Sequence, residues 1–192
     1  MRRAVFLDRD GVLNQLALNS ATGEYESPHH PKDLHLLAGA AEAALALQSA
    51  GFLLFIVSNQ PSYAKGKTSL AHIQTIAANL ETALRTAGVT LTHAFYCYHH
   101  PQGIIPEYSG PCACRKPQPG MLLEAQTRFD LDLANSWMIG DQESDIECGR
   151  RAGCKTALVL NPLSASRRPG RVEPTLSAAD LPDAVKQILA LE

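Results

Sequence analysis

Five short apolar runs alternate along this chain with stretches that have the spacing of amphipathic helices. The apolar runs, which we predict to be strands, are Ala4–Leu7, Phe52–Val57, Ala94–Tyr98, Ser136–Ile139 and Thr156–Leu160. The predicted helices are Ala38–Ala50, a stretch capped by Thr68 or Ser69 and stopped by Gly88, Gly120–Phe129, Asp145–Ala152, and a last helix with Pro182 at its first position that runs through Leu191. Such alternation predicts an α/β fold with a parallel sheet, right-handed crossovers and helices on both faces.

The length and charge of the chain limit the classes of protein to consider. Its 192 residues, 45% of them hydrophobic, suit a single domain over residues 1–192, with no room for a second folded unit between the strands. The net charge of -2 gives no electrostatic basis for binding nucleic acid or an anionic membrane. Arg167, Arg168 and Arg171 form the densest basic cluster, which we interpret as a solvated loop.

The cysteines and the N-terminus indicate a reducing compartment. The apolar run after Arg2-Arg3 ends at Asp8 and is too short for a secretory leader, so we expect a cytoplasmic protein. Five cysteines in that setting favour a metal or catalytic role over disulfides. Cys148 and Cys154 are interpreted as small buried hydrophobic residues.

Polar residues of complementary chemistry follow the predicted strands. They are Asp8 and Asp10 after the first strand, Ser58, Asn59 and Gln60 after the second, Arg115 and Lys116 beyond the third, and Asp141 and Asp145 after the fourth. Because parallel strands end at one edge of a sheet, these side chains are expected to converge, although each taken alone also suits a turn or a helix cap. A carboxylate nucleophile, hydroxyl and amide donors, a lysine and carboxylates that bind Mg²⁺ are what phosphoryl transfer requires.

Four motifs carry a resemblance to a known family. Asp8-Arg9-Asp10-Gly11-Val12, the strand ending in Ser58-Asn59, Lys116-Pro117 and Gly140-Asp141-x-x-x-Asp145 resemble the signature motifs of the haloacid-dehalogenase-like (HAD-like) phosphatases, in order from residue 4 to about residue 160. The stretches 6–11, 58–60 and 112–121 resemble more closely the group of heptose 1,7-bisphosphate and histidinol-phosphate phosphatases. The resemblance implies a Rossmann-like single domain without a large cap, acting on a small phosphorylated sugar or metabolite.

The resemblance also implies a role for each residue. Asp8 would be the nucleophile that forms an aspartyl-phosphate, and Asp10 would protonate the leaving oxygen and then activate water. Mg²⁺ would be held by Asp8, Asp141 and the Asp10 backbone carbonyl, with Asp145 as a ligand or close by. Ser58, Asn59 and Lys116 would hold the phosphoryl group, and Gln60 and Arg115 would contribute to substrate binding.

A second metal site is predicted between residues 97 and 114. Cys97-x-His99 is followed after twelve residues by Cys112-x-Cys114, and a closed Cys₃His set of this kind is typical of structural zinc. Residues two apart on an extended chain point the same way, so Cys97 pairs with His99 rather than His100. A Cys112–Cys114 disulfide and simply buried thiols are the alternatives. Zinc would clamp this loop beside the phosphate site.

Substrate choice is expected to lie in three loops, because the chain has no large cap insertion. They are a polar flap at about residues 15–32, the turn at 58–67 and the zinc loop. The long zinc loop resembles that of the heptose enzymes, and Arg115 suits a second anion, whereas Pro61-Ser62-Tyr63 and Gln142 differ from the heptose pattern. Removal of the C7 phosphate of heptose 1,7-bisphosphate by a monomer is the first hypothesis. A histidinol-phosphate or other metabolite phosphatase and an inactive zinc-stabilised binding protein are the alternatives.

Overall fold

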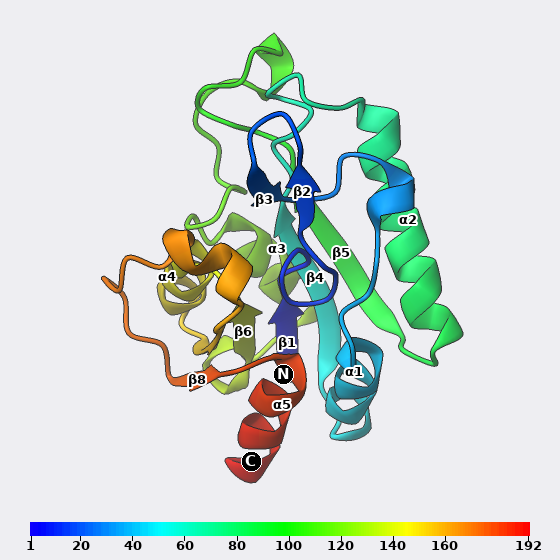
Figure 1. Cartoon of the computed structure of the whole chain (residues 1–192). Helices are drawn as coiled ribbons and strands as arrows, with labels where there is room; N and C mark the ends of the chain where they lie inside the picture. The colour runs from blue at the N-terminus through cyan, green and yellow to red at the C-terminus, as the bar shows by residue number, and fades with distance from the viewer.

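The first strand lies in the middle of a parallel sheet (Figure 1). The structure, a computed structural model, describes residues 1–192. Its six-stranded sheet has the order β5-β4-β1-β6-β7-β8, and every neighbouring pair is parallel. The strands are β1 (Ala4–Leu7), β4 (Leu53–Asn59), β5 (Leu91–Cys97), β6 (Trp137–Gly140), β7 (Lys155–Val159) and β8 (Leu176–Ala178). Val5 on β1 lies opposite Leu54 on one side and Trp137 on the other, so β1 is hydrogen-bonded along both edges.

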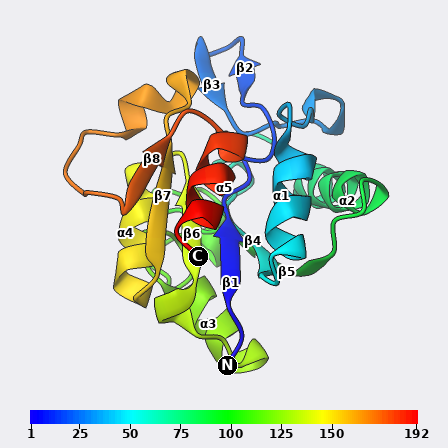
Figure 2. The same cartoon turned by 90° about the horizontal axis from the view of Figure 1, so that it is seen from below.

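Helices cover both faces of the sheet, as predicted (Figure 2). They are α1 (Ala40–Ser49), α2 (Leu70–Thr86), α3 (Gly120–Phe129), α4 (Glu143–Ala152) and α5 (Leu181–Ala190), with 3-10 turns η1 (Pro31–Asp33), η2 (Pro106–Tyr108), η3 (Leu133–Asn135) and η4 (Pro162–Arg167). Alternation along β1 divides the core: Val5 and Leu7 pack with α1, α5 and the end of α2, whereas Ala4 and Phe6 pack with α3 and α4. A sheet buried on both faces explains why its strands read as continuous apolar runs.

Several predicted boundaries differ from the structure. The sixth strand, β8, was not predicted, because it has only three residues and just one of them, Ala178, is buried. β5 begins at Leu91, earlier than the predicted Ala94, since its first residues are only partly buried. α5 begins at Leu181 with Asp180 as its N-cap, so Pro182 occupies the second position of the helix and not the first. α4 begins at Glu143, two residues before the predicted start.

The segment expected to form a flap contains a β-hairpin. β2 (Ala17–Asn19) and β3 (Glu24–Glu26) pair antiparallel, with Leu18 opposite Tyr25. Figure 1 shows the hairpin beyond the carboxyl end of β1. Two contacts hold it to the rest of the chain: Lys67 Nζ lies 2.5 Å from Glu26 Oε2, and Arg167 Nη2 donates to the Tyr25 carbonyl at 2.6 Å. No helix of the structure combines the length and the hydrophobicity that crossing a membrane requires.

Candidate active site

Three carboxylates meet at the carboxyl ends of β1 and β6. Asp8 follows β1, Asp141 follows β6, and Asp145 lies in the first turn of α4; all three are buried. Each offers an oxygen within 4.8 Å of the others. Two glycines leave the space for this approach, because a Cβ on Gly11 would lie 2.2 Å from Asp141 Oδ2 and a Cβ on Gly140 would lie 2.1 Å from Asp145 Cβ. The carboxylates after the first and fourth predicted strands, which are β1 and β6 of the structure, therefore converge as predicted.

The charge of this cluster fits a divalent cation. Burial and the nearby charges of Asp8 and Asp145 raise the pKa of Asp141 to about 8. Burial also raises the pKa of Asp8 to about 6, although the ammonium of Lys116 acts against it. Both carboxylate oxygens of Asp141 are buried without a hydrogen-bond donor in the protein. Oxygen ligands with excess negative charge are the donor set that Mg²⁺ prefers, so Asp8, Asp141 and Asp145 fit this ion.

Lys116 lies between two of the carboxylates. Its Nζ is 2.8 Å from Asp8 Oδ1 and 2.6 Å from Asp145 Oδ1, and it donates to the Val57 carbonyl at 2.7 Å. Burial would lower the pKa of Lys116, but the two carboxylates outweigh burial and raise it above its usual range. Asn59 pairs with the Lys116 backbone, accepting from its N–H at 3.0 Å and donating to its carbonyl at 3.1 Å. The side chain expected to bind substrate at position 59 therefore also positions the lysine.

Asp10 accepts hydrogen bonds from Arg9 and Asn14, to which the motif analysis assigned no role, and from Gln60. The fully buried Arg9 donates to both of its oxygens, at 2.9 and 3.0 Å through Nη2, and Asn14 Nδ2 donates at 3.0 Å. Gln60 Nε2 donates to Asp10 Oδ2 at 2.5 Å and to Ser58 Oγ at 3.0 Å. Burial would raise the pKa of Asp10, but the guanidinium of Arg9 and these hydrogen bonds lower it.

The structure places Gln60, which was predicted to contribute to substrate binding, against the first motif. Its side chain is buried against Arg9 and Asp10 and lines neither cavity of the site.

The position of Arg9 differs from what strand alternation predicts, because alternation would place its side chain on the side opposite Asp8 and Asp10. The chain turns after Leu7, where β1 ends, so the two-residue alternation of a strand does not apply to Arg9, and its side chain reaches Asp10.

Two adjoining cavities open at this edge of the sheet. A chamber of about 30 Å³ is lined by Asp8, Asp10, Ser27, Ser58, Asn59, Lys116, Gln142, Ser144 and Asp145. A larger cavity of about 470 Å³ shares Ser27, Asn59, Lys116, Gln142 and Ser144 with it and adds Glu24, Glu26, Pro61, Ser62, Lys65, Lys67, Arg115 and Arg167. Apart from Pro61 its lining is polar or charged, so this space suits a charged, hydroxylated molecule. Arg115 faces it, as the second-anion hypothesis requires.

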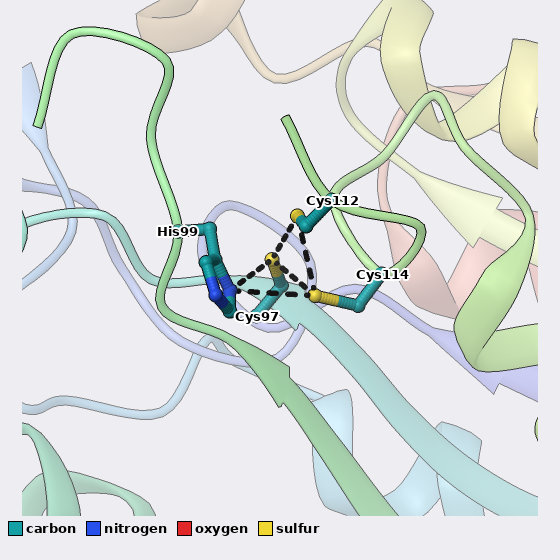
Figure 3. Close-up of side chains that lie close together, drawn as sticks. All are labelled: Cys97, His99, Cys112 and Cys114. Atoms are coloured by element: carbon teal, nitrogen blue, oxygen red, sulfur yellow. Dashed lines mark hydrogen bonds between the residues drawn. The ribbon is translucent and has the colours of Figure 1, made fainter. Parts of the chain in front are cut away.

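The Cys₃His set comes together at the end of β5 (Figure 3). Cys114 Sγ lies 2.8 Å from Cys97 Sγ, 3.4 Å from Cys112 Sγ and 3.7 Å from His99 Nδ1. All five cysteines are free, and the Cys112–Cys114 separation exceeds the roughly 2.05 Å of a disulfide bond. His100 points its Nδ1 to the Gln102 N–H instead. The hydrogen bond with Cys97 lowers the pKa of Cys114 to about 5, and the four side chains are compatible with structural zinc.

Hydrogen bonds and the chain itself connect the Cys₃His cluster to the residues of the active site. The Gln60 N–H donates to the Cys97 carbonyl at 2.7 Å, and Arg115 Nη1 donates to the His99 carbonyl at 3.1 Å. Arg115 and Lys116 follow Cys114 directly along the chain. A metal held by the four residues would therefore restrain both cationic side chains.

The segment interpreted as a solvated basic loop supports the carboxylate cluster. Ser164 Oγ and Arg168 Nη1 donate to the Asp141 carbonyl at 3.3 and 3.0 Å. Asn161 Nδ2 donates to the Gly11 carbonyl at 3.1 Å. Of the three arginines of this basic segment only Arg171 is exposed. The interpretation of the segment as a solvated loop was therefore wrong for Arg167 and Arg168. Short-range sequence patterns carry no signal for these contacts.

Known proteins share both the sequence and the fold of this chain. The HAD-hydrolase-like family model matches residues 113–184. D-glycero-beta-D-manno-heptose-1,7-bisphosphate 7-phosphatase of Escherichia coli K12 is 33% identical over 187 residues, which cover 96% of this chain and 94% of that protein. The chain belongs to the HAD-like phosphatases.

Further members of the HAD-like phosphatases agree with this assignment. The Vibrio cholerae protein of the same name is 36% identical over 157 residues, covering 82% of this chain and 80% of that protein. The crystal structure of D,D-heptose 1,7-bisphosphate phosphatase from B. bronchiseptica, complexed with magnesium and phosphate, superposes with a TM-score of 0.82 at 29% identity over 99% of both chains. HAD-like phosphatases use Mg²⁺, in agreement with the carboxylate cluster.

Replacing Gly11 by alanine is expected to lower the activity of this phosphatase at least 100-fold and to weaken its affinity for Mg²⁺. The added Cβ would overlap Asp141 Oδ2, and the φ of +87° also disfavours alanine. Gly23→Ala is the matched control, because Gly23 has a φ of +71° but nothing within 4 Å of its Cβ position. Phosphate release against Mg²⁺ concentration measures both variants. Equal effects in the two would show that backbone strain, and not the approach to Asp141, makes Gly11 necessary.

Proposed function

We propose that this HAD-like phosphatase removes the C7 phosphate of D-glycero-D-manno-heptose 1,7-bisphosphate in a Mg²⁺-dependent reaction. The observation that carries the proposal is the small chamber in which Asp8, Lys116 and Ser58 meet the carboxylate cluster beside a larger polar cavity. The names of relatives that cover nearly the whole chain support the substrate. Heptose bisphosphate carries two anionic groups, which matches one small and one large polar compartment.

The proposed reaction uses the residues of the chamber. Asp8 Oδ attacks phosphorus, the bond from phosphorus to the sugar oxygen breaks, and that oxygen takes a proton from Asp10, which has to be protonated in the substrate complex although its pKa is lowered in the free protein. Asp10 then takes a proton from the water that hydrolyses the aspartyl-phosphate. Lys116 and the Ser58 hydroxyl hold the phosphoryl oxygens through both steps. When bound by Asp8, Asp141, Asp145 and the Asp10 carbonyl, Mg²⁺ neutralises the charge of the phosphoryl group.

The proposal also assigns roles to two loops and gives the domain organisation, oligomeric state and compartment of the protein. Residues 15–32 act as the flap over the larger cavity, since its Glu24, Glu26 and Ser27 line that space. Residues 97–114 act as the zinc loop of a single domain that spans residues 1–192. The chain works as a monomer in the cytoplasm, because one chain supplies all the residues named and zinc thiolates persist in a reducing compartment.

Phosphate release from two compounds tests the proposed substrate. Heptose 1,7-bisphosphate should be hydrolysed with a higher kcat/KM than histidinol phosphate, and phosphorus NMR should show heptose 1-phosphate as the product. Faster hydrolysis of histidinol phosphate would overturn the substrate and retain the reaction. No Mg²⁺-dependent hydrolysis of any phosphomonoester would overturn the reaction itself.

Metal analysis of the purified protein is expected to find about one zinc per chain. Cys114→Ser should lose this zinc and lower kcat/KM at least tenfold, because Arg115 and Lys116 are no longer restrained. Cys154→Ser is the control, as Cys154 is buried but is not one of the four ligands. Zinc-free protein with full activity would contradict this prediction.

A further inference from the structure

The larger cavity carries more positive charge than its own acidic residues neutralise. Five cations line it, namely Lys65, Lys67, Arg115, Lys116 and Arg167, against two acids, Glu24 and Glu26. Lys67 pairs with Glu26, and Lys116 pairs with the carboxylates of the chamber. Lys65, Arg115 and Arg167 have no acidic partner within ion-pair distance. Burial and then the charges of Lys67 and Arg115 lower the pKa of Lys65, with a further contribution from Arg167, so these cations repel one another. An anion in the cavity would relieve this repulsion.

Arg167 differs from the other cations of the cavity in its position along the chain and in its contacts. It ends η4, far along the chain from the hairpin and from the turn that carries Lys65. Its Nη2 donates to the Tyr25 carbonyl, which is its one side-chain hydrogen bond within the protein. A guanidinium has five N–H donors in a planar fork, so most of its donors remain available to a ligand. The half-buried Arg167 therefore offers fixed donors to the cavity beside the hairpin.

We propose that Arg167 is a specificity-determining residue that binds the non-reacting phosphate of a bisphosphate substrate. This inference rests on the proposed function, in which the phosphate that is hydrolysed occupies the chamber. The chamber lined by Asp8, Ser58 and Lys116 takes the phosphoryl group that is hydrolysed, and the remainder of the substrate extends into the adjoining cavity of about 470 Å³. There Arg167 shares the second phosphate with Lys65 and Arg115 and, through Tyr25, holds the edge of the hairpin against the bound substrate.

Kinetics with a matched pair of substrates test this role. For Arg167→Gln we expect kcat/KM for heptose 1,7-bisphosphate to fall about 10- to 100-fold, mostly through KM, as for loss of a charge-assisted hydrogen bond. The fall for heptose 7-phosphate, which lacks the second phosphate, should be several times smaller. Arg167→Lys should keep part of the discrimination. Arg171→Gln, an exposed arginine outside the cavity, is the control and should match the native enzyme. Equal losses on both substrates, or no loss, would overturn the proposal.

Binding of inorganic phosphate provides a measurement that does not depend on turnover. Without Mg²⁺ the buried carboxylates exclude phosphate from the chamber, so calorimetry then reports on the larger cavity. Arg167→Gln should weaken this binding at least fivefold, whereas Arg171→Gln should leave it unchanged; equal binding by both would overturn the role of Arg167. If the native enzyme hydrolyses neither heptose compound, the proposed function fails, and this titration still decides whether Arg167 binds an anion.

Discussion

Asparagine at position 8 is expected to reduce turnover by a factor on the order of 10⁴ or more. The substitution removes the atom that attacks phosphorus, and uncatalysed hydrolysis of phosphate monoesters is too slow to replace it. The fold should persist. Asp8 is buried with a pKa raised to about 6, so removing its charge relieves repulsion within the cluster, and Lys116 keeps its partner Asp145.

Two measurements separate this effect from unfolding. Phosphate release with saturating Mg²⁺ gives the loss of activity, and the Tm without added Mg²⁺ should equal or exceed that of the native protein. Asp33→Asn is the matched control, because Asp33 lies outside both cavities of the site and its side chain makes no hydrogen bond in the structure. Substantial turnover by a folded Asp8→Asn protein would remove the nucleophile assignment.

Lys116→Met is expected to lower both activity and stability. Activity should fall at least 1000-fold, because the phosphoryl group loses its buried ammonium. Without added Mg²⁺ the free energy of unfolding should fall by about 3–5 kcal/mol, since Asp8 and Asp145 lose a buried cation that both contact. Added Mg²⁺ should restore part of this stability, because it supplies positive charge to the same carboxylates. Lys186→Met on α5, where the lysine is exposed, is the control and should change neither quantity.

The stability of Lys116→Met without Mg²⁺ is expected to depend on pH. The folded-state pKa values of Asp8 and Asp141, about 6 and about 8, lie above their ordinary value of 3.8, so the folded protein binds protons more tightly than the unfolded chain. Stability without Mg²⁺ should therefore fall as pH rises from about 4 to about 8, and the fall should be steeper in Lys116→Met. Denaturant unfolding at pH 5 and pH 8 measures this difference. A variant that is more stable at pH 8 than at pH 5 would contradict the proposed electrostatics.

Local pattern alone predicted the elements that build the sheet. β1 and α3 have the predicted bounds, because a continuous apolar run and a helix bounded by Gly120 and Asp130 are properties of neighbouring residues. The meeting of Asp8, Lys116 and Asp141 was also predictable, since parallel strands end at one edge of their sheet whatever their order. β8 and the start of α5 were missed because a three-residue strand and a one-residue shift of a cap leave little local signal.

The sequence by itself determined the class of fold, the carboxylates at the strand ends and the Cys₃His spacing. Only the tertiary structure decided that Arg9 holds Asp10, that Gln60 faces the motif rather than a cavity, and that η4 supports Asp141. The same is true of the contact between Asn161 and Gly11, which are 150 residues apart. The physical reason is that apolar runs and motif spacings arise from neighbouring residues, whereas these hydrogen bonds form between segments that come together only when the sheet closes its core.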